Sequence, residues 1–205
     1  MYVASDVVAP AAAVSDAPRR CVTLIAGTGS VAVACDGSEG VRVGGWGALF
    51  DDRASGFGIA RDGLACAAAA ADRGKSCVLQ GYLQRCAGVG SMSDLLQWVY
   101  EDPTPAHVAS LAPAILRAAD EGDAAALSIV IAAAAAAADL AVLASERLQC
   151  AGVAAPQVET FLLAGGLFQD ALFRKSVQSC LQDRCRQPEL LRCAPDRGIR
   201  QATAM

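Results

Sequence analysis

The sequence is poor in charged and aromatic residues and contains one histidine. Charged residues make up 19% of its 205 positions, aromatic residues 5%, and the formal net charge is −4. Nucleic-acid-binding proteins usually carry a basic patch, so this acidic balance argues against that class. His107 alone cannot build a histidine metal site, and a Ser-His-Asp triad would depend on this one residue. We expect neither a nucleic-acid partner nor a metal site built from side chains.

The sequence also lacks closely paired cysteines. Its nine cysteines include no C-x-x-C pair, and the nearest two, Cys180 and Cys185, are spaced more widely than zinc ligands usually are. Free thiols in a reducing compartment are the simpler interpretation. The first ten residues, MYVASDVVAP, do not join a basic segment to an apolar one as a secretory signal does. These features predict a cytoplasmic protein.

No apolar run in the sequence reaches the roughly 20 residues of a membrane-spanning helix. The longest run, residues 127–138, includes seven consecutive alanines and stops at Asp139. Hydrophobic residues still make up 54% of the chain, which is enough for a sizeable core and too many for a disordered polypeptide. We therefore predict a buried helix here and no membrane partner.

The order of predicted elements indicates an α/β fold. Three short strands, residues 21–26, 31–35 and 40–43, follow one another through tight turns and predict an antiparallel meander. Helices are predicted over 55–72, 92–100, 107–120 with a kink at Pro113, 124–150, 169–182 and a tail from 196, with strands at 158–163 and 189–193. This order is typical of a ribonuclease-H-like lobe, in which helices flank a mixed sheet.

The first chemical motif is Gly27-Thr28-Gly29-Ser30, at the tip of a predicted hairpin. Glycines let a backbone approach an anion and point successive N–H groups at it, and the hydroxyls add donors. No lysine follows, and a strand leaves the turn, so the motif is not a Walker A loop. A phosphate-binding turn and a plain hairpin turn both fit.

A second glycine-rich segment, Gly44-Gly45-Trp46-Gly47, is followed by Asp51-Asp52. The Trp46 ring could lie against the apolar face of a sugar, or it could fill the core within a tight turn. The two carboxylates could accept hydrogen bonds from sugar hydroxyls or hold a hydrated metal ion, or they could belong to a solvated turn.

Two further features complete the set. Ala164-Gly165-Gly166 follows a predicted strand, where a flat ligand could lie on the backbone ahead of a helix N-terminus; close packing of strand and helix is the alternative. Asp6 stands at the head of an alanine-rich run, a position that an aspartate usually takes as a helix cap.

Taken in order, these motifs resemble the N-acetylglucosamine kinase family, which includes the BadF/BadG/BcrA/BcrD-type ATPases and belongs to the actin-like ATPase superfamily. The resemblance covers about residues 3–200 and rests on Asp6, LIAGTGS, GGWG, DRASGFGIARDGL, LAPAILRAADEGDAAA and FLLAGGLF. It implies ATP-dependent phosphorylation of an amino sugar, N-acetyl-D-glucosamine to its 6-phosphate above all, with ATP and Mg²⁺.

The resemblance also implies roles for particular residues. Asp6 would be the catalytic base and would contact the sugar, accepting the proton of the attacking hydroxyl. The ATP-binding residues would be Gly27, Thr28, Gly29, Gly165 and Gly166. The other sugar-binding residues would be Ser30, Gly45, Trp46 and Asp52.

The sequence departs from the family pattern in two places. Family members carry an N-terminal lobe with an Asp-Gly-Gly-Gly-Thr phosphate loop, which this sequence lacks, so we expect residues 1–205 to be a single C-terminal lobe. Residues 51–56 read Asp-Asp-Arg-Ala-Ser-Gly, where the family more usually has Asp-Glu-Gly-Ser-Gly. Two alternatives stay open: a BadF-type activator ATPase, and a non-catalytic lobe that binds a sugar or nucleotide. An uncovered apolar cleft face could also pair in a homodimer.

Overall fold

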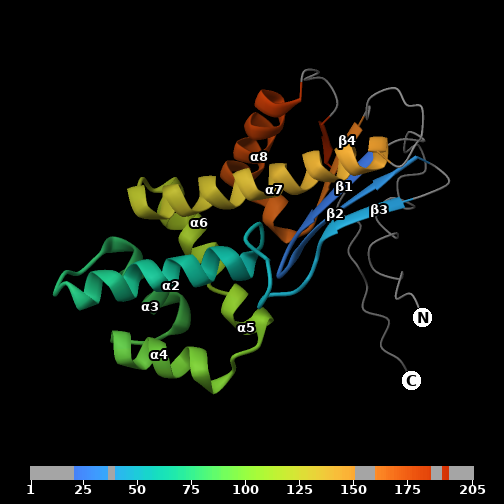
Figure 1. The fold of residues 1–205 in the computed structure, drawn as a ribbon. Helices are drawn as coiled ribbons and strands as arrows, with labels where there is room; N and C mark the ends of the chain where they lie inside the picture. Colours follow the sequence, from blue (N-terminus) through green and yellow to red (C-terminus); the bar gives the residue numbers. More distant parts are fainter. Residues whose placement is uncertain (1–20, 37–39, 151–159, 186–190, 194–205) are drawn as a thin grey trace.

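A five-stranded mixed sheet forms the centre of the computed structural model, which describes residues 21–36, 40–150, 160–185 and 191–193 (Figure 1). The strand order is β3-β2-β1-β4-β5. The strands are β1 (Cys21–Ala26), β2 (Ser30–Cys35), β3 (Gly40–Gly44), β4 (Thr160–Ala164) and β5 (Leu191–Cys193). The first three pair antiparallel, and β4 and β5 run parallel to β1, which confirms the predicted meander and mixed sheet.

The register of the sheet brings the carboxyl ends of β1 and β4 to one edge. β1 pairs with β2 from Cys21↔Cys35 to Ala26↔Ser30, and it pairs in parallel with β4 up to Ile25↔Ala164. Because parallel strands end at the same edge of a sheet, the segments that follow β1 and β4 lie side by side. One face of β1, with Val22, Leu24 and Ala26, packs into the main hydrophobic core.

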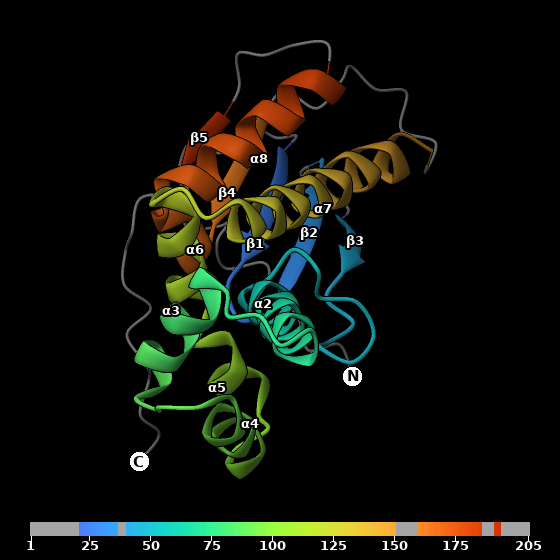
Figure 2. The same ribbon diagram turned by 90° about the vertical axis from the view of Figure 1, so that its left-hand side faces the viewer.

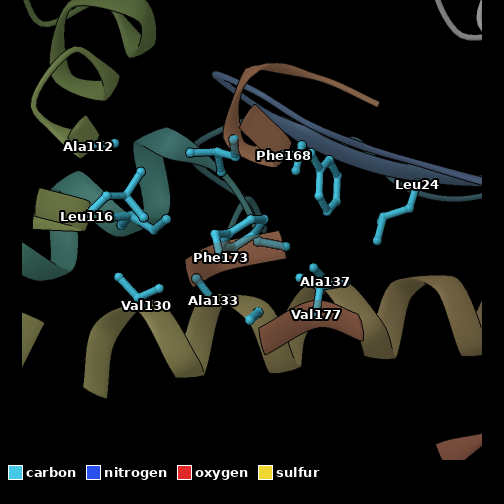
Figure 3. Packing of buried hydrophobic residues seen from close by; sticks show 14 of the residues in the cluster. Leu24, Ala112, Leu116, Val130, Ala133, Ala137, Phe168, Phe173 and Val177 are labelled. Carbon is cyan, nitrogen blue, oxygen red and sulfur yellow. The ribbon is translucent and has the colours of Figure 1, made fainter. Parts of the chain in front are cut away.

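Two long helices, α7 (Ala124–Cys150) and α8 (Ala171–Arg184), pack against each other over this core. Figure 3 shows Phe173 and Val177 of α8 facing Ala133 and Ala137 of α7. The alanine side chains are short, so the two helix backbones can approach closely around the larger Phe173 ring. Phe173 is fully buried, and burying such a side chain contributes about 1.5–3 kcal/mol.

Helix α7 spans the range that the sequence predicted. Its stretch Ala124–Gln149 is long and apolar enough to cross a membrane by length and composition alone, a property that the core helix of a globular protein can share. The helix crosses the sheet and contacts β1, β2 and β3. Val130, Ala134 and Ala138 on its inner side are fully buried in the core, which confirms the predicted buried helix.

The remaining helices stand to one side of the sheet (Figures 1 and 2). They are α2 (Gly56–Asp72), α3 (Val78–Ala87), α4 (Met92–Glu101), α5 (Pro105–Ala109) and α6 (Ala112–Asp120). Helices α2 and α6 contact α7 and join this group to the core, whereas α4 packs against α3.

Two sequence predictions need correction here, and a third cannot be compared with the described residues. Helix α3 was not predicted, because its mixed sequence with a central glycine gives little apolar periodicity. Residues 107–120 form parts of two helices, and Pro113 lies in the first turn of α6, where its missing N–H costs nothing, rather than at a kink. The predicted tail helix from 196 lies outside the described residues.

Candidate functional site

The two glycine motifs at the carboxyl ends of β1 and β4 touch each other. Gly165 has a φ of +102°, and a Cβ atom there would lie 2.3 Å from the carbonyl oxygen of Ala26. Only glycine fits such a conformation at such a distance. The segment after β4 therefore lies directly against the end of β1, beside the turn formed by residues 27–30, which we call the β1–β2 turn. Ligands of open α/β sheets bind outside the carboxyl ends of strands like these.

The β1–β2 turn presents two free amides. Its one internal hydrogen bond runs from Gly27 N to Gly29 O at 2.9 Å, and Thr28 at the tip is exposed. The backbone N–H groups of Thr28 and Gly29 donate no hydrogen bond to the part of the chain that the structure describes. Two successive unpaired amides beside a hydroxyl leave a set of hydrogen-bond donors open to an anion.

The carbonyl groups of the turn are held by the start of α2. Gly56 N donates to Gly27 O at 2.7 Å, and Phe57 N donates to Thr28 O at 3.2 Å. The first amides of α2 are thus already used, so this helix N-terminus is not a separate anion site. Fixing both carbonyls toward α2 turns the peptide N–H groups of the β1–β2 turn away from it.

Asp51 and Asp52 occupy different environments, although they are neighbours in the acidic turn (residues 51–55). Asp51 is half-exposed and pairs with Arg53 at 3.1 Å. Asp52 is buried, and its Oδ1 accepts hydrogen bonds from Ser30 N at 3.1 Å and Ser30 Oγ at 3.5 Å. The two carboxylates therefore do not form a shared site, and the solvated-turn interpretation suits Asp51 alone.

The GGWG loop (residues 44–47) leaves its tryptophan in solvent. Trp46 is 74% exposed, which excludes the alternative of a core tryptophan. The Arg42 guanidinium donates hydrogen bonds to the carbonyl oxygens of Gly44 and Gly45 and so fixes the backbone of the loop. Gly45 has a φ of +69°, so the loop turns where glycine is favoured. Trp46 is available to a ligand, with Leu49 and Phe50 exposed next to it.

The segment after Gly165 differs from the prediction. A single 3-10 turn, η1 (Gly166–Gln169), separates it from α8, which begins at Ala171 and is capped by Asp170 through Phe173 N at 2.8 Å. No helix N-terminus therefore stands directly beyond the glycines. Gly165 packs closely against β1, whereas a Cβ atom at Gly166 would meet nothing within 4 Å. Close packing and an open glycine surface are therefore both present in this segment.

A small open pocket of about 170 Å³ lies between the acidic turn and α7. Its lining includes Ser30, Asp51, Arg53 and, from α7, Asp139 and Leu140. The volume is below the 300–1,000 Å³ typical of ligand pockets, so it does not hold a nucleotide by itself. Sequence reasoning missed the contribution of α7; an aspartate that ends an alanine run was the available signal.

Among the described residues, the two thiols of β1 and β2 are not reactive groups. Cys21 and Cys35 face each other across β1 and β2, at the end of the strands opposite the β1–β2 turn. Burial raises the pKa of both thiols, which keeps them protonated and unreactive. Seven cysteines of the described ranges are free, and no group of three His, Cys, Asp or Glu side chains there could hold a metal ion.

The strand order and the flanking helices define a ribonuclease-H-like α/β lobe. The family model of the BadF/BadG/BcrA/BcrD ATPases matches residues 3–190. The chain belongs to this family. Comparison with curated proteins found no match.

Solved structures show the same fold. A candidate N-acetylglucosamine kinase from Chromobacterium violaceum matches with a TM-score of 0.58 and 23% identity, over 84% of this chain and 55% of that one. One from Porphyromonas gingivalis matches with a TM-score of 0.58 and 22% identity, over 80% of this chain and 53% of that one. The chain thus spans about half the length of these two proteins.

Proposed function

We propose that this chain is the C-terminal lobe of an ATP-dependent sugar kinase. The whole protein would transfer the γ-phosphoryl group of ATP to an amino sugar, N-acetyl-D-glucosamine to its 6-phosphate. The observation that carries the proposal is the pair of free amides at Thr28 and Gly29, held open beside the glycine surface of Gly165. Family membership and the fold support the use of ATP.

The nucleotide would lie along the carboxyl edge of β1 and β4. The amides of Thr28 and Gly29 and the Thr28 hydroxyl would donate to phosphate oxygens, and Gly27 allows the close approach. Gly165 and Gly166 would offer a flat backbone surface to the adenosine. A Cβ atom at Gly166 would meet nothing within 4 Å, so the surface there is open.

The sugar would bind between the β1–β2 turn and the GGWG loop. The exposed Trp46 ring, supported by Gly45, would lie against the apolar face of the sugar ring. Ser30 and Asp52 would face the sugar hydroxyls, with Asp6 as the base; Asp6 lies outside the described residues. The sugar O–H would attack the γ-phosphorus while Asp6 takes its proton, and the bond between the γ-phosphorus and the bridging oxygen would break to release ADP.

Magnesium would enter with the nucleotide. The described residues offer no group of three metal ligands, which fits a hydrated ion held mainly by phosphate oxygens. Such an ion would neutralise charge on the phosphates. The β1–β2 turn itself supplies neutral amides and a hydroxyl, so the ion would add positive charge beside it.

The location and the assembly of the protein are also part of the proposal. The free thiols suit a reducing, cytoplasmic location. Exposed Trp46, Leu49 and Phe50 form an apolar surface that a homodimer or a first lobe could cover.

Two other functions are open to a member of this family. One is a BadF-type activator ATPase, and the other is a non-catalytic lobe that only binds sugar or nucleotide. An activator would hydrolyse ATP without a sugar acceptor. The free, dispersed cysteines give no described cluster site of the kind that such activators often use, which favours the kinase.

The test is a coupled assay of ADP release with and without N-acetylglucosamine. We expect ADP release that depends on the sugar and is lost in Asp6→Asn, for this chain or for the protein extended by an upstream lobe. Sugar-independent hydrolysis in both forms would favour the activator. Nucleotide or sugar binding without turnover in both would leave the binding lobe, and no binding at all would refute the proposal.

A further inference from the structure

Asp52 is the one buried charged side chain among the described residues. It is 5% exposed, whereas the other buried polar side chains are hydroxyls. A buried carboxylate is costly unless hydrogen bonds compensate for the lost water. Its Oδ1 receives two donors, the backbone N–H and the hydroxyl of Ser30, and both bonds join the acidic turn to the first residue of β2.

The backbone of Asp52 is fixed as firmly as its side chain. Ser55 donates to the Asp52 carbonyl oxygen through both its N–H, at 3.2 Å, and its hydroxyl. Ser55 Oγ also accepts from Gly58 N at 3.0 Å and so caps α2. A Cβ atom at Gly58 would lie 2.4 Å from the same carbonyl oxygen, so the acidic turn and α2 are in direct backbone contact.

We propose that Asp52 is a positioning residue for nucleotide binding, acting through the Ser30 amide on the free amides of Thr28 and Gly29. This inference rests on the proposed function. It adds a second role to the carboxylate, because Oδ1 holds the β1–β2 turn while Oδ2 accepts no hydrogen bond from the described residues and stays available to a ligand hydroxyl.

The physical reason is that three contacts hold the turn open. Gly27 O and Thr28 O are bound by the first amides of α2, and Ser30 N is bound by Asp52. Ser30 directly follows the two free amides in the chain. Without the carboxylate, a buried Ser30 N–H would lack its acceptor, and the turn would rearrange to satisfy it. The open arrangement of its neighbours would then be lost.

The side chain lies against the turn as well. A Cβ atom at Gly29 would be 3.2 Å from Asp52 Oδ2, so the carboxylate borders the peptide that carries one of the free amides. Shortening the side chain at position 52 would open space beside Gly29 and permit a second arrangement of the turn.

Three variants of the full chain separate charge from positioning. Asp52→Asn keeps an oxygen that can accept from Ser30 N but removes the charge. Asp52→Ala removes the acceptor. Asp51→Ala is the matched control, because Asp51 is half-exposed and pairs only with Arg53 among the described residues. Circular dichroism and the thermal midpoint establish that each variant is folded.

The experiment measures amide hydrogen exchange of Ser30 by NMR and binding of the non-transferable analogue AMP-PNP with magnesium by calorimetry. In Asp52→Ala we expect exchange at Ser30 to accelerate and AMP-PNP affinity to fall, each by about tenfold or more, as for loss of a charge-assisted hydrogen bond. In Asp52→Asn both should stay within about fivefold of wild type, since a neutral bond remains. Asp51→Ala should match wild type.

Two results for Asp52→Ala would overturn the inference alone. One is unchanged Ser30 exchange in a folded Asp52→Ala; the other is faster exchange with unchanged AMP-PNP affinity. Equal losses in Asp52→Asn and Asp52→Ala would assign the effect to charge and would also overturn it. Where the chain binds AMP-PNP only when extended by the upstream lobe, the variants are compared in that form. Failure of both wild-type forms to bind AMP-PNP would overturn the proposed function together with this inference, so the two failures are distinguishable.

Discussion

The contact between Gly165 and Ala26 gives the sharpest test of the arrangement at the carboxyl edge of the sheet. In Gly165→Ala the new Cβ atom would lie 2.3 Å from Ala26 O and 2.7 Å from Ala26 C, so backbone must move. A non-glycine residue at a positive φ costs about 1–2 kcal/mol, and overpacking a tight contact costs about 1–3 kcal/mol. Together these predict a loss of about 2–5 kcal/mol in the free energy of unfolding.

Thermal unfolding followed by circular dichroism measures this loss. For a chain of this size, about 1 kcal/mol shifts the midpoint by about 2–4 °C, so Gly165→Ala should lower it by about 4–20 °C. Gly166→Ala is the matched control, because a Cβ atom there meets nothing within 4 Å, and it should change the midpoint by no more than about 2 °C. Equal midpoints for the two variants would refute the close contact between β1 and the segment after β4.

Three further predictions concern other parts of the molecule. Gly58→Ala should lower the free energy of unfolding, measured with denaturant, by about 1–3 kcal/mol, because its Cβ atom would meet backbone oxygens of the acidic turn. The control Gly81→Ala, whose Cβ atom would meet only a flexible arginine tip, should be neutral or slightly stabilising. A larger loss in Gly81→Ala than in Gly58→Ala would contradict the packing. The hydrogen bond from Tyr82 and the neighbouring arginines lower the pKa of Glu121, so its contribution to stability is present above its unfolded value of 4.5 and is lost as the pH falls through the lower folded pKa. Thermal midpoints between pH 3 and 7 should fall less steeply in Glu121→Gln, and an unchanged acid slope would contradict this. The exposed Cys86 should react with a maleimide before the buried Cys21 of β1. Partial desolvation of its sulfur raises the pKa of Cys86 and slows the reaction without reversing this order. Mass spectrometry of the labelled peptides decides the order, and faster labelling of Cys21 would contradict the burial of β1.

Much of the sheet was predictable because its strands carry local signals. Alternating apolar residues and glycine turns mark residues 21–44, and the boundaries of β1 match the prediction. The buried α7 was predictable both in its alanine-rich core contacts and in its length, because the helical pattern continues beyond Asp139 to residue 150. Helix α3 carries no comparable apolar pattern. It is stabilised by tertiary contacts with α2 and α6, which the local sequence does not reveal.

The candidate site was predictable in its motifs and less so in its contacts. The sequence places Gly27–Ser30 and Gly165 after strands, and a parallel register is enough to bring them together. It does not separate Asp51 from Asp52, because the difference between an exposed and a buried carboxylate depends on Ser30, which lies 22 residues away. The motif around Trp46 fits an exposed ring and a core ring equally well, so its exposure is likewise not given by the sequence. Arg42, which donates to the loop carbonyl of Gly44, carries no local signal of that contact.

The most direct test of the account is the response of the Thr28 and Gly29 amides to nucleotide. In a ¹⁵N–¹H NMR titration of the chain with magnesium AMP-PNP, we predict saturable shifts of these two amides. The amide of Gly88, at the end of α3 and already hydrogen-bonded, should stay unchanged. Saturable binding that leaves Thr28 and Gly29 unshifted would contradict the claim that the β1–β2 turn holds the phosphates.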